Sequence, residues 1–357
     1  MTRADGGTLV TGGAGFIGCA LSRLLAPEAE RWVAFDNLHP QVHPTRERPA
    51  DLDPAAELVV GDVTKPDDWE ALLDGFRPNV VVHLAAETGT AQSLHEATRH
   101  AAVNVVGTTA LLDALGRVGH RPRHFVLSSS RAVYGEGEWR GDDGEIRRPG
   151  QRTHAQLESA QWDFAGSAPL PSESTRTWPA PTSVYGATKL AQEHVLRAWA
   201  GAHDVSLSVL RFQNVYGPGQ SLTNSYTGIV SLFSQLARRG EAIPVYEDGL
   251  ITRDFVFIDD VAASLAAVMG RDLSIADVST HDIGSGIATT ILELAGAIAA
   301  YYDAPAPRVT GQFRDGDVRH ASCDISRSTT ELSWSPTVDL TTGVGRLQEW
   351  ISTQPTT

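Results

Sequence analysis

Short runs of branched apolar residues alternate with amphipathic segments along the first 212 residues of the chain. The apolar runs predict buried strands at Thr8 to Val10, Arg31 to Phe35, Glu57 to Val60, Asn79 to Leu84, His124 to Leu127 and Ser206 to Phe212. The amphipathic segments, with apolar residues three and four positions apart, predict helices at Phe16 to Leu25, Asp67 to Leu73, Ser93 to Val118 and Ser183 to Ala202. Such alternation is typical of βαβ units, so we expect an α/β fold with a doubly wound parallel sheet.

Two segments interrupt this rhythm, Leu38 to Pro54 and Glu136 to Pro181, and both are rich in Pro, Gly and charged residues. We interpret both as loops. The second is long for a structureless connection, so we expect either a lid or a segment with a little structure of its own. It has no Cys and a single His, His154, which argues against a metal site within it. Beyond Asn214 the elements become short and mixed, which predicts a smaller α/β lobe at the C-terminus.

The composition narrows the possible partners and the compartment. The formal net charge of −14 argues against nucleic acid and anionic membranes, because both select basic surfaces. Only Cys19 and Cys323 are present, so we expect free buried thiols and a reducing compartment. No stretch supplies the roughly 20 apolar residues that a membrane-spanning helix needs. We therefore expect a cytoplasmic protein.

A glycine-rich turn joins the first predicted strand to the first helix. Gly12, Gly15 and Gly18 permit a tight turn and a close approach to a pyrophosphate, which the N-terminus of the helix would attract. Asp36 ends the second strand, where a carboxylate can accept hydrogen bonds from both adenosine ribose hydroxyls and would repel a 2′-phosphate. The pattern predicts a Rossmann domain that binds NAD rather than NADP, with Asn37 assisting Asp36.

Further strand ends should border the same cofactor, because ligands of open parallel sheets lie beyond the carboxyl ends of the strands. His83, at the end of the fourth strand, is expected to be a packed residue and not a catalyst. The cofactor-binding residues that we expect besides those of the preceding paragraph are Phe16, Ile17, Asp62, Val63, Leu84, Ala85 and Ala86.

Tyr185 and Lys189 stand four positions apart at the start of a helical pattern, so both project from one helix face. A phenol with a pKa near 10 must be acidified by positive charge before it can accept a proton at neutral pH. Lys189 and an oxidised nicotinamide would both supply that charge. Ser130, after the fifth strand, can hydrogen-bond the same substrate oxygen. We expect these three residues to be catalytic.

The motifs together resemble the extended short-chain dehydrogenase/reductases, and among them the NAD-dependent epimerase/dehydratase family, from Thr8 to about Trp350. They read TGGAGFIG, FDNL, GDV, HLAAETG, NVVGT, SSSRAVYG, YGATK, RFQNVYGPGQ, TRDFVFIDDV, RDGDVRH and LSWSP. The resemblance implies tightly held NAD, a nucleotide diphosphate sugar as substrate and often a homodimer formed through two helices of each subunit. It also implies an NAD-binding domain over residues 1–213, with 254–285 returning to it, and a nucleotide-sugar-binding lobe over 214–357.

The same resemblance implies site residues. Asn104 and Ser128 would join the cofactor contacts, as would Tyr185 and Lys189. Asn214, Arg253 and Arg314 would meet the diphosphate, a role that suits arginine because its guanidinium matches phosphate oxygens. The remaining expected substrate contacts are Glu87, Thr88 and Ser130.

The residues after Ser130 bear on the reaction. They are Arg131 and Ala132, where the 4,6-dehydratases of the family resemble one another in carrying an Asp-Glu pair. Loss of water requires a general acid and a base there, so the sequence argues against dehydration and favours epimerisation at the sugar C4. The stretches SSSRAVYGEG and QNVYGPGQSLTNSYTGI resemble 4-epimerases of dTDP-6-deoxyhexoses, such as the dTDP-L-rhamnose type.

Several alternatives stay open at this level. A NAD(P)H-dependent 4-ketoreductase of a nucleotide deoxysugar would use the same Tyr185, Lys189 and Ser130. A UDP-hexose 4-epimerase is less well matched, because those enzymes carry a lysine at the position of Thr88. Inversion at C2, decarboxylation of a uronic acid and a nucleotide-sensing module without chemistry also fit the scaffold. The nucleobase and the sugar are not identified by the sequence.

Overall fold

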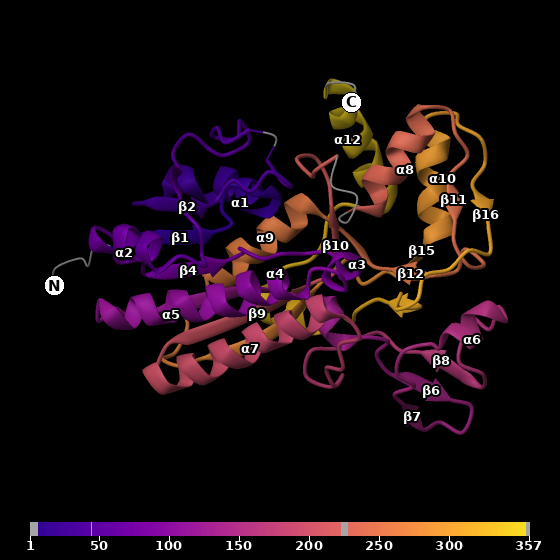
Figure 1. Ribbon diagram of the computed structural model, residues 1–357, viewed down its shortest axis with the longest axis horizontal. Coiled ribbons are helices and arrows are strands. Elements are labelled where there is room, and N and C mark those ends of the chain that lie inside the picture. The colour runs from indigo at the N-terminus through magenta and orange to yellow at the C-terminus, as the bar shows by residue number, and fades with distance from the viewer. Residues whose placement is uncertain (1–5, 44, 223–227, 355–357) are drawn as a thin grey trace.

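The computed structural model describes residues 6–43, 45–222 and 228–354. Its centre is a seven-stranded sheet in which every pair of neighbouring strands is parallel (Figure 1). The predicted parallel sheet is therefore confirmed. In spatial order the strands are β14 (Val278–Ile283), β9 (Ser206–Phe212), β5 (His124–Ser130), β4 (Val80–His83), β1 (Thr8–Thr11), β2 (Trp32–Asp36) and β3 (Glu57–Val60).

Helices cover both faces of this sheet. On one face α1 (Phe16–Leu25) packs against α9 (Ile258–Met269), and α11 (Ser326–Leu332) lies against α9 and β14. On the other face α5 (Gly107–Arg117) packs between α2 (Pro66–Asp74) and α7 (Val184–His203). Among the described residues, no helix is both long enough and apolar enough to cross a bilayer.

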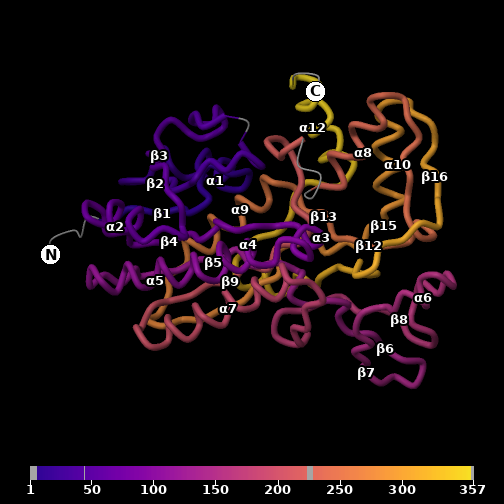
Figure 2. The backbone as a smooth tube through the Cα atoms, viewed as in Figure 1, coloured from indigo at the N-terminus to yellow at the C-terminus, as the bar shows by residue number. Residues whose placement is uncertain are grey.

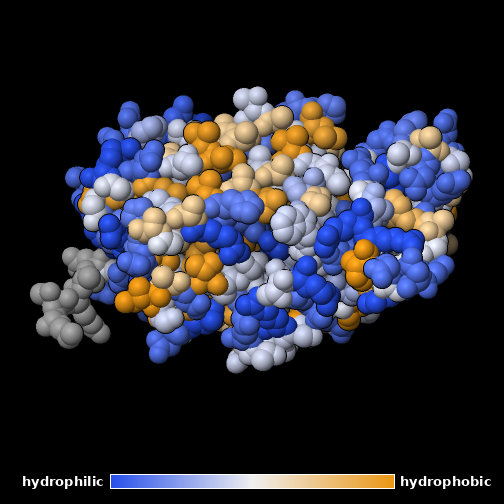
Figure 3. All heavy atoms as spheres, turned by 90° about the horizontal axis from the view of Figure 1, so that it is seen from below, coloured by the Kyte–Doolittle hydropathy of each residue, from blue (hydrophilic) through white to orange (hydrophobic). Residues whose placement is uncertain are grey.

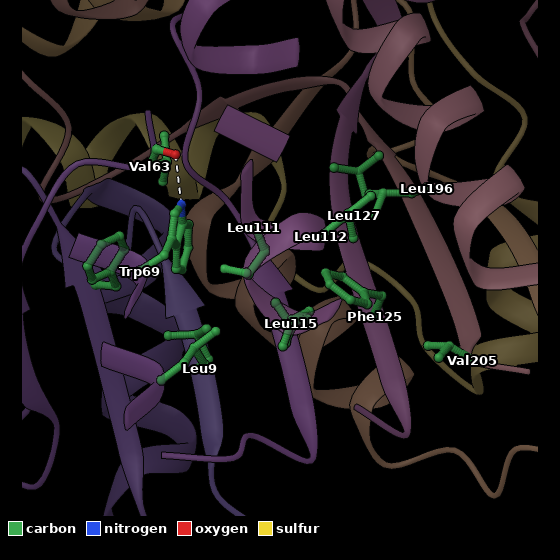
Figure 4. Close-up of a cluster of buried hydrophobic side chains, with 14 of the residues drawn as sticks. Leu9, Val63, Trp69, Leu111, Leu112, Leu115, Phe125, Leu127, Leu196 and Val205 are labelled. Carbon is green, nitrogen blue, oxygen red and sulfur yellow. Dashed lines mark hydrogen bonds between the residues drawn. The ribbon is translucent and has the colours of Figure 1, made fainter. Parts of the chain in front are cut away.

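The core beneath α2, α5 and α7 shows why the apolar residues recur as they do. In Figure 4 the side chains of Leu111, Leu112 and Leu115 point from α5 toward Phe125 and Leu127 of β5. Residues three and four apart thus meet the alternating side chains of a buried strand. On the same side of the sheet, Trp69 Nε1 donates a 2.8 Å hydrogen bond to the carbonyl oxygen of Val63, so this buried indole has its polar group satisfied.

The C-terminal lobe has its own apolar cluster, built around three helices. These are α8 (Ile229–Arg238), α10 (Ile291–Tyr301) and α12 (Leu340–Thr353). Short strand pairs tie the lobe together; they are β10 (Asn214–Tyr216) with β13 (Phe255–Phe257), β11 (Pro244–Val245) with β16 (Arg308–Val309), and β12 (Thr252–Arg253) with β15 (Thr289–Thr290) and β17 (His320–Ala321). The tube in Figure 2 shows α8, α10 and β16 side by side at one end of the molecule.

Between residues 136 and 181 the chain forms a small unit that we call the insert. It contains β6 (Trp139–Gly141), β7 (Ile146–Arg147), α6 (His154–Glu158) and β8 (Ser167–Pro169). The three strands form an antiparallel sheet that projects below the C-terminal lobe in Figure 1. Of the two expectations for this segment, structure of its own is the one that is observed.

The helix predicted from Ser93 to Val118 is wrong as a single element. The chain forms α3 (Thr90–Ser93), α4 (Ala97–Ala101), a π-helical turn η2 (Ala102–Val106) and then α5. Tertiary contacts decide the interruptions: the Ser93 hydroxyl accepts a hydrogen bond from the Tyr185 amide, 3.1 Å away. The wide turn of η2 holds Asn104, whose side chain reaches both Glu87 and Thr188. Such π-turns are frequent at functional sites.

Candidate active site

The glycine turn lies at the carboxyl end of β1, where α1 begins. Gly12 has φ +63°, and a Cβ there would lie 2.8 Å from the backbone nitrogen of Ala85. A Cβ on Gly18 would lie 2.5 Å from the carbonyl oxygen of Gly13. Both positions therefore require glycine, one for the turn and one for close packing of α1. The turn leaves a cradle without side chains at the N-terminus of α1, which fits the pyrophosphate of a dinucleotide.

Asp36 ends β2 beside this turn. Its carboxylate accepts hydrogen bonds from the amides of Ala14 at 3.1 Å and Leu38 at 2.9 Å. His43 Nε2 lies 3.7 Å from the same carboxylate. The side chain of Asn37 donates to Asp62 at 3.2 Å. The carboxylate is thus fixed at the pocket wall, where the ribose of NAD would need an acceptor.

One cavity of about 710 Å³ joins the glycine turn to the C-terminal lobe. Its lining includes the predicted site residues, with the exception of Asp62 and Asn104. Asp62 lies behind Asn37, and Asn104 is fully buried behind Glu87. These two therefore hold other residues in position. The predicted residues that line the cavity are Gly12, Gly15, Phe16, Ile17, Gly18, Asp36, Asn37, Val63, Leu84, Ala85, Ala86, Glu87, Thr88, Ser128, Ser130, Tyr185, Lys189, Asn214, Arg253 and Arg314.

The structure brings Ser130, Tyr185 and Lys189 together in this cavity. The α7 helix starts at its N-cap Ser183, whose hydroxyl accepts from the Gly186 amide at 3.0 Å, and this fixes the first turn, which carries Tyr185. Desolvation in the pocket raises the pKa of Tyr185, while the Ser130 hydroxyl and the charge of Arg131 act in the opposite direction. Burial lowers the pKa of Lys189 to about 7. Ser130 and Arg131 are thus the groups of the chain that favour the phenolate form of Tyr185, which proton acceptance from a substrate hydroxyl requires.

A buried hydrogen-bond network is centred on Glu193, whose charge acts on Lys189. Glu193, one turn further along α7, is held by two hydrogen bonds from Arg211, of 3.0 and 2.7 Å. Ser129 donates to the same carboxylate at 2.5 Å. The charge of Glu193 favours the ammonium form of Lys189 and so partly offsets its burial. The members of this network come from three separate elements, so no sequence motif predicts it.

His83 is a packed residue, as the sequence predicts. Its ring nitrogens contact the hydroxyls of Thr11 at 2.7 Å and Thr108 at 2.9 Å. Burial lowers the pKa of His83 to about 3, so the ring is neutral at physiological pH.

Arg131, Arg253 and Arg314 line a part of the cavity that we call the cationic end, although Asp317 lines the cavity as well. Arg253 is buried and donates to the Thr252 carbonyl at 2.7 Å. The guanidinium of Arg314 lies 5.1 Å from the centre of the Tyr246 ring. The sequence analysis missed a third cation: Arg131 also lines the cavity and donates through Nε to Asn214 Oδ1 at 2.9 Å. Its position directly after Ser130 was the available signal.

The insert forms hydrogen bonds with the segment that carries Arg314 and with its support. Arg152 forms two hydrogen bonds with Glu247, of 2.9 and 2.8 Å, and donates to the Asp317 carbonyl at 2.9 Å. His154 lies 3.0 Å from the carboxylate of Asp315. The insert therefore forms part of the support of the cationic end of the cavity, although it lies outside the cavity itself.

Glu87 and Thr88 lie in the loop after β4 and line the cavity. The Glu87 carboxylate is ion-paired with Arg99 at 2.9 Å. Its amide and carbonyl are both bonded to the Asn104 side chain. The loop after β4 is thus rigidly shaped beside Tyr185.

Comparison with known proteins identifies this architecture. Residues 8–278 match the NAD dependent epimerase/dehydratase family. The chain belongs to this family. It is 62% identical over 344 residues to the dTDP-L-rhamnose 4-epimerase of Burkholderia thailandensis, a match that covers 96% of this chain and 94% of that one.

Solved structures of family members have the same fold. The UDP-glucose 4-epimerase of Thermotoga maritima with UDP-glucose has a TM-score of 0.79 at 28% identity, and the match covers 97% of this chain and 98% of that one. The UDP-glucose 4-epimerase of Thermus thermophilus in complex with NAD has a TM-score of 0.77 at 25% identity, over 97% and 99% of the two chains. The predicted Rossmann fold, family, enzyme class and NAD dependence are confirmed.

Proposed function

We propose that the protein inverts C4 of a dTDP-6-deoxyhexose and that dTDP-L-rhamnose is its first candidate substrate. The observation that carries this proposal is the 62% identity, over almost the whole chain, to a dTDP-L-rhamnose 4-epimerase. The pocket supports it, because Ser130 and Tyr185 share one cavity with three arginines suited to a diphosphate.

The reaction begins at the sugar hydroxyl on C4. Tyr185 accepts the proton of this hydroxyl, and Ser130 donates a hydrogen bond to the same oxygen as it becomes a carbonyl. NAD, which the glycine turn and Asp36 would hold, would supply hydride acceptance from C4 and hydride return to the opposite face. Tyr185 then returns the proton, and atoms and charge balance over the cycle.

Inversion requires that the keto sugar turn over between the two hydride transfers. The lining supports such a division, because it contains Arg131, Arg253 and Arg314, whose guanidiniums suit a diphosphate. The diphosphate would be anchored there by charge-assisted hydrogen bonds. The sugar, with fewer charged partners, can then rotate beside Tyr185.

The test separates an epimerase from a 4-ketoreductase. Purified protein is incubated with dTDP-L-rhamnose, dTDP-glucose, UDP-glucose and UDP-glucuronic acid without added cofactor, and the products are read by NMR. We expect inversion at C4 of dTDP-L-rhamnose. Stoichiometric oxidation of NADH or NADPH with a dTDP-4-keto-6-deoxyhexose, without inversion of dTDP-L-rhamnose, would establish the ketoreductase instead. Equal turnover of UDP-glucose would refute the choice of a 6-deoxyhexose.

Assembly and location are further parts of the proposal. A homodimer through the helices around α5 and α7 is supported by the exposed apolar side chains of Leu94 and Val106, close to α4 and in η2. Figure 3 shows apolar surface interspersed with polar residues on one face of the molecule. The cytoplasmic location and the division into residues 1–213 with 254–285, and 214–357, stay predictions. Residues 223–227, in the stretch that resembles deoxyhexose 4-epimerases, lie outside the described residues.

A further inference from the structure

Arg131 is fixed by one side of its guanidinium only. It lies in the 3₁₀ turn η3 (Arg131–Tyr134), whose N-cap is Ser130. Its Nε donates to Asn214 Oδ1 at 2.9 Å. Within the described part of the chain, its two terminal nitrogens form no hydrogen bond and no ion pair. The guanidinium therefore presents two terminal nitrogens, with four N–H donors between them, on a side chain that lines the cavity.

Two buried arginines that stabilise the fold differ from Arg131 in having carboxylate partners. Arg152 and Arg319 are both buried, and each is ion-paired with the Glu247 carboxylate, at 2.8 and 2.9 Å. Arg319 is paired with Asp163 and Asp248 as well. Buried arginines of this chain that serve the fold are thus neutralised by carboxylates. Arg131 and Arg253 lack an ion pair within the described residues, which indicates an anion from outside the chain.

The electrostatic interactions of Arg131 indicate that it lies close to both Tyr185 and Arg253. Burial and the positive charge of Arg253 lower the pKa of the Arg131 guanidinium, while Asp317, Tyr185 and Glu136 act in the opposite direction. Arg131 in turn acts on the pKa of Tyr185. It is therefore near both the reactive phenol and the cationic end of the cavity.

We propose that Arg131 binds the phosphate that is attached directly to the sugar, through its two terminal nitrogens. This inference rests on the proposed function and adds a substrate-binding residue to it. Asn214 aligns the guanidinium by accepting from Nε, so that the free fork meets two phosphate oxygens. Arg253 and Arg314, further along the cationic end, are then left for the nucleoside-side phosphate. The sugar would be tethered at its anomeric end, one residue from the catalytic Ser130.

The proposal can be tested with two nucleotides that differ by one phosphate. Binding of dTDP and dTMP to the NAD-loaded protein is measured by calorimetry for wild type, Arg131→Met and Arg131→Lys. We expect Arg131→Met to weaken dTDP about 10- to 100-fold, the loss of a charge-assisted contact, and to leave dTMP within about twofold. Arg131→Lys keeps the charge but not the fork, so we expect a smaller loss for dTDP.

Control variants and outcomes separate this proposal from the proposed function. Arg314→Met should weaken both nucleotides, because it is assigned to the shared phosphate. Unchanged dTDP affinity in Arg131→Met, or equal losses for dTDP and dTMP, would overturn the assignment. If wild type binds UDP and UMP but neither thymidine nucleotide, the dTDP-sugar proposal fails, and the same comparison with UDP and UMP still tests Arg131. Should Arg131→Met not fold, the ratio of dTDP to dTMP losses in Arg131→Lys decides.

Discussion

Arg152 and Glu247 face each other through two hydrogen bonds of 2.9 and 2.8 Å, with side chains that are 1% and 0% exposed. They are 95 positions apart, one in the insert and one in the C-terminal lobe. Glu247 also exchanges backbone hydrogen bonds with Gln312 and Gly311, at the start of the segment that carries Arg314. The pair therefore couples the insert to a predicted phosphate contact.

Arg152→Met is expected to raise KM for the nucleotide sugar while kcat changes less, because the Arg314 segment loses its support. It should also lower the free energy of unfolding by about 3–5 kcal/mol, as breakage of a buried pair does. Steady-state kinetics and urea unfolding measure the two effects. The matched control is Arg239→Met, which breaks an exposed pair (54% and 52% exposed) worth about 0–1 kcal/mol. A loss of stability with an unchanged KM would show that the insert has a purely structural role.

Tyr185→Phe should lower turnover by about 10²- to 10⁴-fold, because the ring stays and only the proton-exchanging hydroxyl is removed. Bound NAD, released by denaturation and quantified by absorbance, should be as abundant as in wild type. Tyr301→Phe, on an exposed tyrosine, is the control and should keep wild-type turnover. Wild-type activity in Tyr185→Phe would rule out the mechanism proposed for C4.

Asp36→Asn should shift the cofactor preference toward NADP. The substitution keeps the size of the side chain but removes the charge that repels a 2′-phosphate, so we expect the ratio of the NAD and NADP affinities to change by about tenfold or more. Competition binding to the cofactor-free protein gives this ratio. Asp74→Asn, at an exposed position of α2, should leave it unchanged. An unaltered ratio in Asp36→Asn would show that the adenosine ribose lies elsewhere.

Acid should destabilise the fold through its buried histidines. Burial lowers the pKa of His83 to about 3 and that of His124 to about 4, so both stay neutral in the folded chain while the unfolded chain protonates them below about pH 6.5. Their stabilising contribution is complete above the unfolded pKa and is lost as the pH falls toward the folded values. Each histidine should lower the free energy of unfolding by about 2 kcal/mol at pH 5.

The check is urea unfolding of wild type and His83→Gln between pH 7 and pH 5. The variant should lose less stability over this range than wild type does. His95→Gln, on an exposed histidine, should follow the wild-type curve. Equal pH dependence in His83→Gln and wild type would mean that this ring is not held neutral.

The sheet and the glycine turn could be predicted because local chemistry determines them. Thr8 to Val10 and Ser206 to Phe212 are rich in apolar residues, as central parallel strands are, and both are strands in the structure. Gly12 and Gly18 are required by a backbone shape that few other residues permit. These signals do not depend on distant parts of the chain.

Other features depend on partners far away in sequence, which a single sequence does not reveal. The break after Ser93 follows from contacts with Tyr185, not from any loss of helical periodicity. The insert is organised by Arg152 and Arg319, whose carboxylate partners lie in the C-terminal lobe or elsewhere in the insert. Arg131 was noted only for replacing an acidic residue, and its relation to Asn214 emerged from the fold.

The strand β14 closes the sheet next to β9, although about 65 residues of chain separate the two. During synthesis, β9 leaves the ribosome before β14 does. Until residue 283 has also emerged, one edge of β9 has no strand to pair with and is exposed. The cofactor half of this enzyme would then be completed only after much of the other half has been translated. Truncation before Val278 should yield an aggregation-prone fragment rather than an autonomous dinucleotide-binding module.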